Sequence, residues 1–181
     1  MNVFLENKLK KAFIKNNPLA EYGINASVQH NKLYAEATTK AQKAKIREYW
    51  RLQLDDIGAK YVHEQTRDCF LQDVCELKRR MNNTYGHLFC ATGFKVSHAQ
   101  KSLAIYLKFK WCQGIFPAPP LCPIDRNVLK ALGEPWKLHP WTTMTWEDYL
   151  ADLNEIARRS ERDGLSVAQW ELLLFSGNES E

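Results

Sequence analysis

Residues 97–112 constrain the fold most, because they predict a helix that is apolar on almost every side. The segment reads SHAQKSLAIYLKFKWC, and its large apolar residues go around the whole helical circumference instead of forming one stripe. These residues are Leu103, Ile105, Tyr106, Leu107, Phe109 and Trp111. A helix of this kind lies in the centre of a domain. The remaining segments must therefore supply the layers that surround it.

Apolar residues spaced three and four apart predict further helices around this central one. A first helix ends before Pro18, since proline cannot continue a helix, and a last one follows a capping box of Ser166 and Gln169. The other helices are expected at about residues 39–61, 65–82, 125–132 and 145–163. Residues 21–37 are ambiguous, and residues 84–97 predict a short helix and a turn. No alternating strand pattern occurs, so the sequence predicts an all-α fold.

Length and composition favour one domain over residues 1–181. Hydrophobic residues make up 45% of the 181 residues, enough for a sizeable core, and no linker interrupts the pattern. No apolar run approaches the roughly 18 residues of a membrane helix. The five cysteines form no CxxC pair, which suggests reduced thiols in a cytoplasmic protein. We expect the protein to be a monomer. His87 and Cys90 lack further ligands at zinc-like spacing, so we expect neither a metal nor another cofactor.

The charge is unevenly distributed along the chain. Residues 1–144 contain 22 Lys and Arg against 12 Asp and Glu, whereas residues 145–181 contain 3 against 9. A basic body with acidic C-terminal helices is compatible with a polyanionic partner such as nucleic acid, although charges also simply solvate helices. Lys43, Arg47 and Arg51 lie on the polar side of the helix at 39–61 and are candidates for DNA contacts.

A proline-rich connection leads to one aspartate. The stretch FPAPPLCPIDRNVLKAL runs from Phe116 to Leu132, and its prolines exclude both helix and central strand before Asp125. Asp125 can be the N-cap of the helix that follows, because its carboxylate can accept bonds from the first free amides. Val128 stands where a capping box would have Glu or Gln. The alternative is a catalytic carboxylate that the rigid segment holds in place.

Residues 94–132 resemble the helix-hairpin-helix superfamily of DNA glycosylases. AQKSLAIYLKF is similar to the family's lysine-bearing helix, PIDRNVLKAL is similar to its aspartate-bearing segment, and 24 residues separate Lys101 from Asp125. The sequence departs from the family in having a single Gly93 where a GxG hairpin is usual, and it lacks the four-cysteine iron–sulfur motif. The resemblance implies a compact all-α domain that acts on double-stranded DNA.

The resemblance also implies roles for individual residues. Asp125 would stabilise the oxocarbenium-like sugar and activate water, and Lys101 would either attack the anomeric carbon or only contact DNA. A flipped-out base would need an aromatic or apolar pocket, for which Trp111, Trp136 and Trp141 are candidates beside the plainer role of core packing. Lys95, His98 and Arg126 would join the DNA contacts.

Three functions are compatible with these patterns. The first is a glycosylase for a modified base, in genome repair or in phage defence against glucosylated hydroxymethylcytosine. The second is a non-enzymatic helical nucleic-acid-binding protein in which Asp125 only caps a helix. The third is a protein-binding module of a defence system. The surroundings of Asp125 distinguish them, because a cleft that Lys101, Asp125 and aromatic rings line favours the enzyme.

Overall fold

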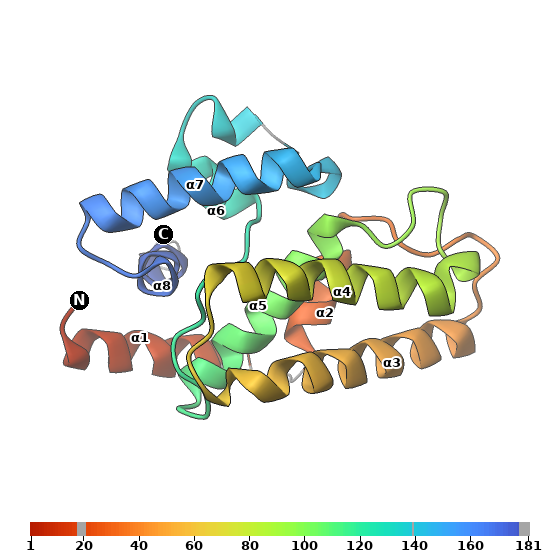
Figure 1. Cartoon of the computed structure of the whole chain (residues 1–181), viewed down its shortest axis with the longest axis horizontal. Coiled ribbons are helices and arrows are strands. Elements are labelled where there is room, and N and C mark those ends of the chain that lie inside the picture. The colour runs from red at the N-terminus through yellow and green to blue at the C-terminus, as the bar shows by residue number, and fades with distance from the viewer. Residues whose placement is uncertain (18–20, 139, 178–181) are drawn as a thin grey trace.

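The computed structural model describes residues 1–17, 21–138 and 140–177, and within them the chain is all-helical, as predicted (Figure 1). The α-helices are α1 (Val3–Asn16), α2 (Tyr22–Val28), α3 (Lys40–Gly58), α4 (Arg67–Tyr85), α5 (Val96–Cys112), α6 (Arg126–Leu132), α7 (Trp146–Arg162) and α8 (Val167–Gly177). Short 3₁₀ turns are η1 (Ala59–Val62), η2 (Gly86–Leu88), η3 (Trp136–Leu138) and η4 (Trp141–Thr143). None of the described helices has the length and apolar character needed to cross a bilayer.

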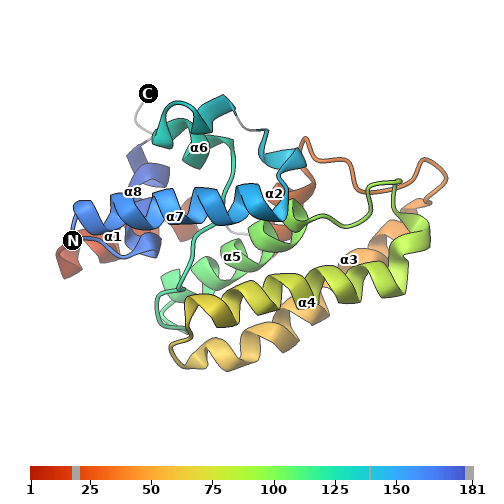
Figure 2. The ribbon, with the colours of Figure 1, turned by 45° about the horizontal axis from the view of Figure 1, so that its top comes forward.

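Helix α5 is the central element that its sequence predicts. Of its 17 residues, 13 are buried. It runs behind α4 in Figure 1, and Figure 2 shows it between the α3–α4 pair and the group formed by α6, α7 and α8. Helix α2 packs closely against α5, with Gly23 beside Ser102 and Ile105, and α1 packs against α5 and α8. The stripe of α4 is equally well predicted: Phe70, Val74, Leu77 and Met81 are completely buried. Burial of this apolar surface is the main force that holds the layers together.

Polar caps set the helix boundaries. The predicted capping box of α8 is present, since Gln169 N donates to Ser166 Oγ at 3.2 Å and Ser166 N donates to Gln169 Oε1 at 3.2 Å. Thr39 and Gln42 form the same arrangement at the start of α3. Gly164 ends α7 with φ of 65°, a left-handed conformation that glycine adopts without steric cost. These caps explain why the boundaries of the longer helices lie close to the predicted ones.

The ambiguous segment 21–37 and the segment 84–97 both contain irregular stretches. Residues 21–37 form α2 and then an extended stretch, whose Tyr34 makes an isolated antiparallel bridge with Phe89. Residues 84–97 contain η2 and a turn with Gly93 at φ of 62°, as predicted. Each of the five cysteines is a free thiol.

A buried ion pair joins α5 to α8. Lys108 Nζ lies 2.7 Å from Glu171 Oε2, and both side chains are almost completely buried. The ammonium also lies 4.4 Å from the centroids of the Phe13 and Phe175 rings, so that α1 and α8 enclose it with aromatic faces. Phe13 also belongs to a smaller apolar cluster, whose other buried members are Trp111, Ala168 and Leu172. Burial raises the pKa of the Glu171 carboxyl, against the opposing effect of Lys108.

Replacing one partner of this pair should destabilise the fold more than replacing both. Lys108→Met leaves a buried carboxylate without its cation, and we expect a loss of about 3–5 kcal/mol in the free energy of unfolding. The double variant Lys108→Met, Glu171→Leu should recover most of that loss, because neither charge then remains buried. Urea denaturation of both variants measures the difference, with Lys130→Met on the exposed side of α6 as the control. A single variant within about 1 kcal/mol of wild type would contradict this account.

Candidate active site

The fold brings Lys101 and Asp125 together. Lys101 is the sixth residue of α5, in its second turn, and is 7% exposed. Asp125 is the N-cap of α6. Lys101 Nζ lies 3.3 Å from Asp125 Oδ2, although 24 residues separate the two in the chain. The two residues expected to be catalytic therefore form an ion pair at one place.

The two oxygens of Asp125 have different partners. Oδ1 accepts bonds from the amides of Asn127, at 2.9 Å, and Val128, at 3.2 Å, and thereby caps α6. Oδ2 points to Lys101. The carboxylate of Asp125 is thus compatible with both roles considered for it, helix cap and catalytic group. One oxygen caps α6, and the other faces a lysine. The cap also restricts rotation of the carboxylate.

Gln100 fixes the distance between the two segments. Its Nε2 donates to the carbonyl oxygen of Ile124 at 2.7 Å, and its Oε1 accepts from the amide of Ile124 at 3.0 Å. Gln100 and Ile124 are completely buried, and each is the chain neighbour of one member of the Lys101–Asp125 pair. Breaking these bonds would leave polar groups unsatisfied in the core. The side chain of Gln100 therefore acts as a fixed spacer, and sequence reasoning did not identify it.

A cavity of about 570 Å³ opens beside the ion pair. Trp141 forms one wall, and Lys101 Nζ lies 4.2 Å from the centroid of its ring. The lining combines three cations with one carboxylate and several neutral polar groups. The lining residues are Gln29, His30, Lys101, Asp125, Arg126, Asn127, Lys137, Leu138, Pro140, Trp141 and Thr142. The cavity falls within the volume range of ligand pockets, and its cationic lining suits an anionic ligand.

His30 gives the cavity a strained edge. Its φ is 56°, in the left-handed region that residues with a side chain rarely adopt. Such conformations concentrate at functional sites, where the surrounding structure holds them. The segment of Gln29 and His30 follows α2 in the part of the sequence that was ambiguous, so its position at the cavity could not be predicted.

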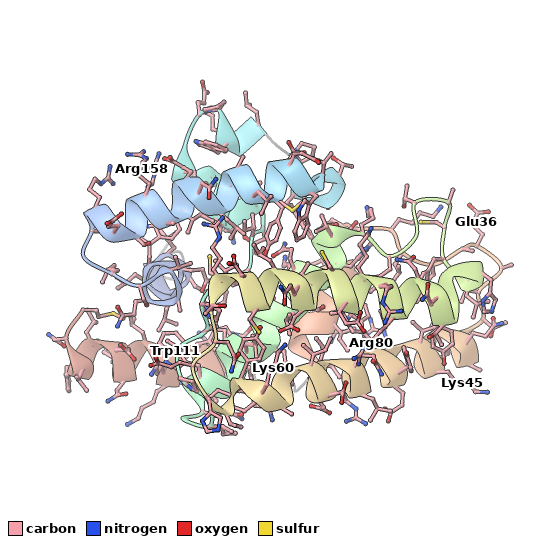
Figure 3. The ribbon with its side chains drawn as sticks, viewed as in Figure 1. Glu36, Lys45, Lys60, Arg80, Trp111 and Arg158 are labelled. Atoms are coloured by element: carbon pink, nitrogen blue, oxygen red, sulfur yellow. The ribbon has the colours of Figure 1, made fainter. Side chains whose placement is uncertain are left out.

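Trp111 does not belong to this cavity, and its assignment to a base pocket is corrected. It lies ten residues beyond Lys101 on the same helix, about 15 Å along the axis at the usual rise per residue. Figure 3 labels it beside α1, where Lys10 Nζ is 4.3 Å from the centroid of its ring. It packs with Phe13 in the smaller apolar cluster. Trp136 is half-buried against the main core, next to Lys137 of the cavity lining.

The predicted DNA-binding cations have different surroundings. Arg126 is exposed at the rim of the cavity. Lys95 is half-buried, and its Nζ donates to the carbonyl oxygen of Thr142 at 2.6 Å. On α3, Arg47 donates to Asn25 at 2.6 Å, and Arg51 is paired with Glu48 and Asp55. Lys43 lies 5.3 Å from the ring centroid of Tyr34. Contact of any of these residues with DNA stays a prediction.

His98 is buried, and its proposed contact with DNA is corrected. Its side chain has no exposed surface. Its Nδ1 accepts from the amide of Lys95 at 3.1 Å, and its Nε2 lies 3.3 Å from the carbonyl oxygen of Asn31, an arrangement that assigns the proton to Nε2. Burial lowers the pKa of His98 to about 4. The ring joins the start of α5 to the loop after α2 and has a structural role.

Comparisons of the chain with protein families, with curated proteins and with solved structures found no match. The description of the site therefore depends on its own geometry. Within the described residues, His87 and Cys90 belong to no group of three or more side chains that could hold a metal ion.

Acid should destabilise the protein through His98. The unfolded chain binds a proton at the ordinary histidine pKa of 6.5, whereas the folded chain binds it only near 4. Stability is therefore lost as the pH falls between these values, by about 2–3 kcal/mol from about pH 7 to about pH 4.5. Urea denaturation of wild type and of His98→Gln at both pH values isolates this contribution. The carboxylates titrate in both proteins, so their effect on stability cancels in the comparison. Equal pH dependence of the two proteins would contradict the assignment.

Proposed function

We propose that this chain is a DNA glycosylase, which flips a modified base out of double-stranded DNA, excises it and leaves an abasic site. The observation that carries the proposal is the Lys101–Asp125 pair, with Nζ and Oδ2 3.3 Å apart beside the ring of Trp141 in a cavity. The resemblance of residues 94–132 to helix-hairpin-helix glycosylases supports the same function. A cap with no further role would not need a buried lysine at its second oxygen.

Hydrolysis requires a carboxylate that is held still beside the anomeric carbon. The C1′–N bond breaks, and its electron pair leaves with the base, which takes up a proton from solvent. The positive charge that develops on the sugar lies against Asp125 Oδ2, and the cap on Oδ1 fixes the orientation of this oxygen. Water bonds to C1′ through its oxygen and gives a proton to Oδ2, which releases it to solvent and so replaces the proton that the base took up. The ammonium of Lys101 keeps the carboxylate in place and contacts the DNA.

The polar lining of the cavity favours a base with a polar substituent. Gln29, His30 and Asn127 offer hydrogen-bonding groups, and Arg126 and Lys137 add donors at the rim. A site with several hydrogen-bonding groups discriminates against ligands that leave those groups unpaired. A hydroxyl-rich base such as glucosylated hydroxymethylcytosine satisfies this requirement, and its excision would be a phage-defence activity. A panel of modified duplexes with abasic-site detection tests the choice of base against ordinary repair substrates.

Asp125→Asn should separate catalysis from capping. Asparagine is also a good N-cap, so we expect the fold to persist. The rate of base release should fall roughly 100-fold or more, because the variant lacks the charge and the proton acceptor. Single-turnover kinetics measures this rate on the best duplex of the panel. Asp125→Ala is the matched control: it should be equally inactive and less stable than Asp125→Asn by about 1 kcal/mol. A wild-type rate of base release for Asp125→Asn would assign the residue to capping alone and place the catalytic group elsewhere.

Lys101 should not cut the DNA strand. An ion-paired ammonium has no lone pair for attack, so water is the expected nucleophile and the product is an intact strand with an abasic site. A single-turnover reaction is divided, and one half is treated with alkali. Strand breaks should occur only in that half, and borohydride should trap no protein–DNA adduct. Equal cleavage in both halves, abolished by Lys101→Gln, would instead show that the lysine amine attacks the sugar.

A further inference from the structure

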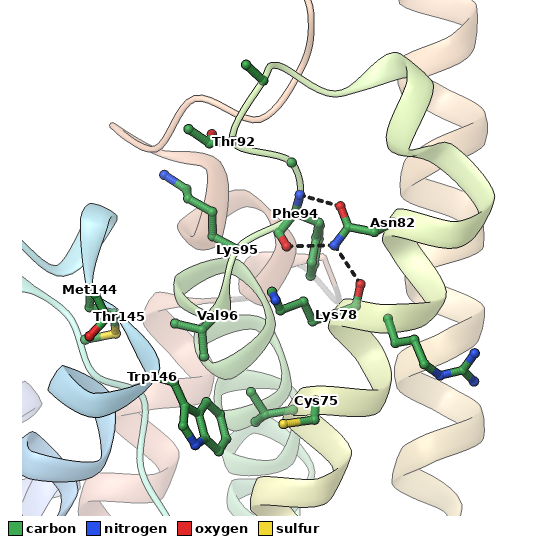
Figure 4. A pocket seen from close by; sticks show the side chains of 14 residues that line it. Cys75, Lys78, Asn82, Thr92, Phe94, Lys95, Val96, Met144, Thr145 and Trp146 are labelled. Atoms are coloured by element: carbon green, nitrogen blue, oxygen red, sulfur yellow. Dashed lines mark hydrogen bonds between the residues drawn. The ribbon is translucent and has the colours of Figure 1, made fainter.

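A second cavity, of about 870 Å³, lies beside the candidate active site. Figure 4 shows its walls: the second half of α4, the loop before α5 and the start of α7. The two cavities share a boundary, because Lys95 lines the second cavity while its Nζ donates to the carbonyl oxygen of Thr142, which lines the first. A ligand longer than one nucleotide could therefore occupy both.

The charge of the second cavity is of one sign. Its lining residues are Val74, Cys75, Lys78, Arg79, Asn82, Ala91, Thr92, Gly93, Phe94, Lys95, Val96, Met144, Thr145 and Trp146. They include three cations and no carboxylate. Arg79 is bonded to Glu76 at 2.7 Å. Lys78 is exposed, and among the residues described here no carboxylate is within ion-pair distance of its ammonium. This lining is complementary to a phosphate.

The loop that forms one wall is held in a fixed shape. Asn82 Oδ1 accepts from the amide of Phe94 at 2.9 Å, and its Nδ2 donates to the carbonyl oxygens of Phe94, at 2.9 Å, and Lys78, at 2.8 Å (Figure 4). Gly93 has φ of 62°, and a Cβ atom there would lie 2.7 Å from Asn82 Oδ1. The wall is thus built before any ligand arrives, which reduces the entropy cost of binding.

Trp146 supplies an aromatic surface in the same cavity. It is the first residue of α7, its ring is half-buried, and it contacts Tyr149 with 5.6 Å between the ring centroids. In Figure 4 its indole lies below Val96, on the side of the cavity that Cys75 of α4 borders. A cationic lining with an aromatic ring is the arrangement that binds unpaired nucleotides, because phosphates contact the cations and bases stack on the ring. The volume of the cavity exceeds what a phosphate alone requires.

We propose that the second cavity binds an unpaired nucleotide next to the one that enters the candidate active site, with Lys78 on its phosphate and Trp146 stacked on its base. This inference rests on the proposed function for the identity of the ligand. It implies that the protein binds DNA with a bulged or unpaired base more tightly than fully paired DNA of the same length.

Binding to unmodified DNA tests this inference without any base release. Fluorescence anisotropy gives the affinity for two labelled duplexes, one fully paired and one with a single unpaired thymine. Trp146→Leu should weaken binding of the unpaired duplex roughly tenfold and leave the paired duplex nearly unaffected, whereas Trp146→Phe should retain most of the preference. Lys78→Gln should make the slope of log affinity against log salt shallower by about 0.9. Lys11 is an exposed lysine on α1, and Lys11→Gln should change neither the preference for the unpaired duplex nor the salt slope.

The outcomes are separable. Equal affinity of wild type for the two duplexes, or variants that behave like Lys11→Gln, would overturn the inference. Equal losses in Lys78→Gln and Lys11→Gln would also overturn it, because net charge would then explain them. If the expected pattern appears while no duplex of the panel loses a base, the nucleotide site stands and the glycosylase proposal fails.

Discussion

Every buried polar side chain on helix α5 has a partner on another element, and these pairings arrange the rest of the chain around it. An unsatisfied buried group costs about 1–3 kcal/mol, so each pairing fixes one neighbour against α5. The pairs are Ser97 with Asn31, His98 with Asn31, Gln100 with Ile124, Lys101 with Asp125, Ser102 with Trp50, and Lys108 with Glu171. They reach the loop after α2, then α3, the proline-rich segment, α6 and α8. Apolar burial supplies the driving force, and these bonds specify the orientation.

The candidate active site is built from two of these pairings between α5 and other parts of the chain. Gln100 and Lys101 are consecutive on α5, and their partners Ile124 and Asp125 are consecutive in the chain. One pair is structural and the other faces a cavity. The site therefore has the rigidity of the core although one of its walls is a loop, and rigid placement of a carboxylate is what stabilisation of a sugar cation requires.

The sequence predicted what depends on local patterns. Stripes at helical spacing located α3, α4 and α7, and the Ser166–Gln169 box located α8. The association of Lys101 with Asp125 came from a resemblance, since spacing alone does not show that two residues 24 positions apart meet. The predicted DNA contact of His98 and the predicted place of Trp111 in a base pocket fail for one physical reason. On a helix that is buried on all sides, the sequence pattern does not show which neighbour each residue faces. Gln100 and His30 were missed because their roles depend on tertiary partners.

The ion pair between Lys108 and Glu171 has a consequence for synthesis on the ribosome. When residues up to 165 have been translated, α5 is complete, but the carboxylate for Lys108 does not yet exist, and Phe13 lacks its neighbours Ala168 and Leu172. The nascent chain therefore holds an uncompensated cation and an open apolar face at its centre. The contacts of this smaller cluster are complete only when α8 packs against α1 and places Glu171 beside Lys108 of α5.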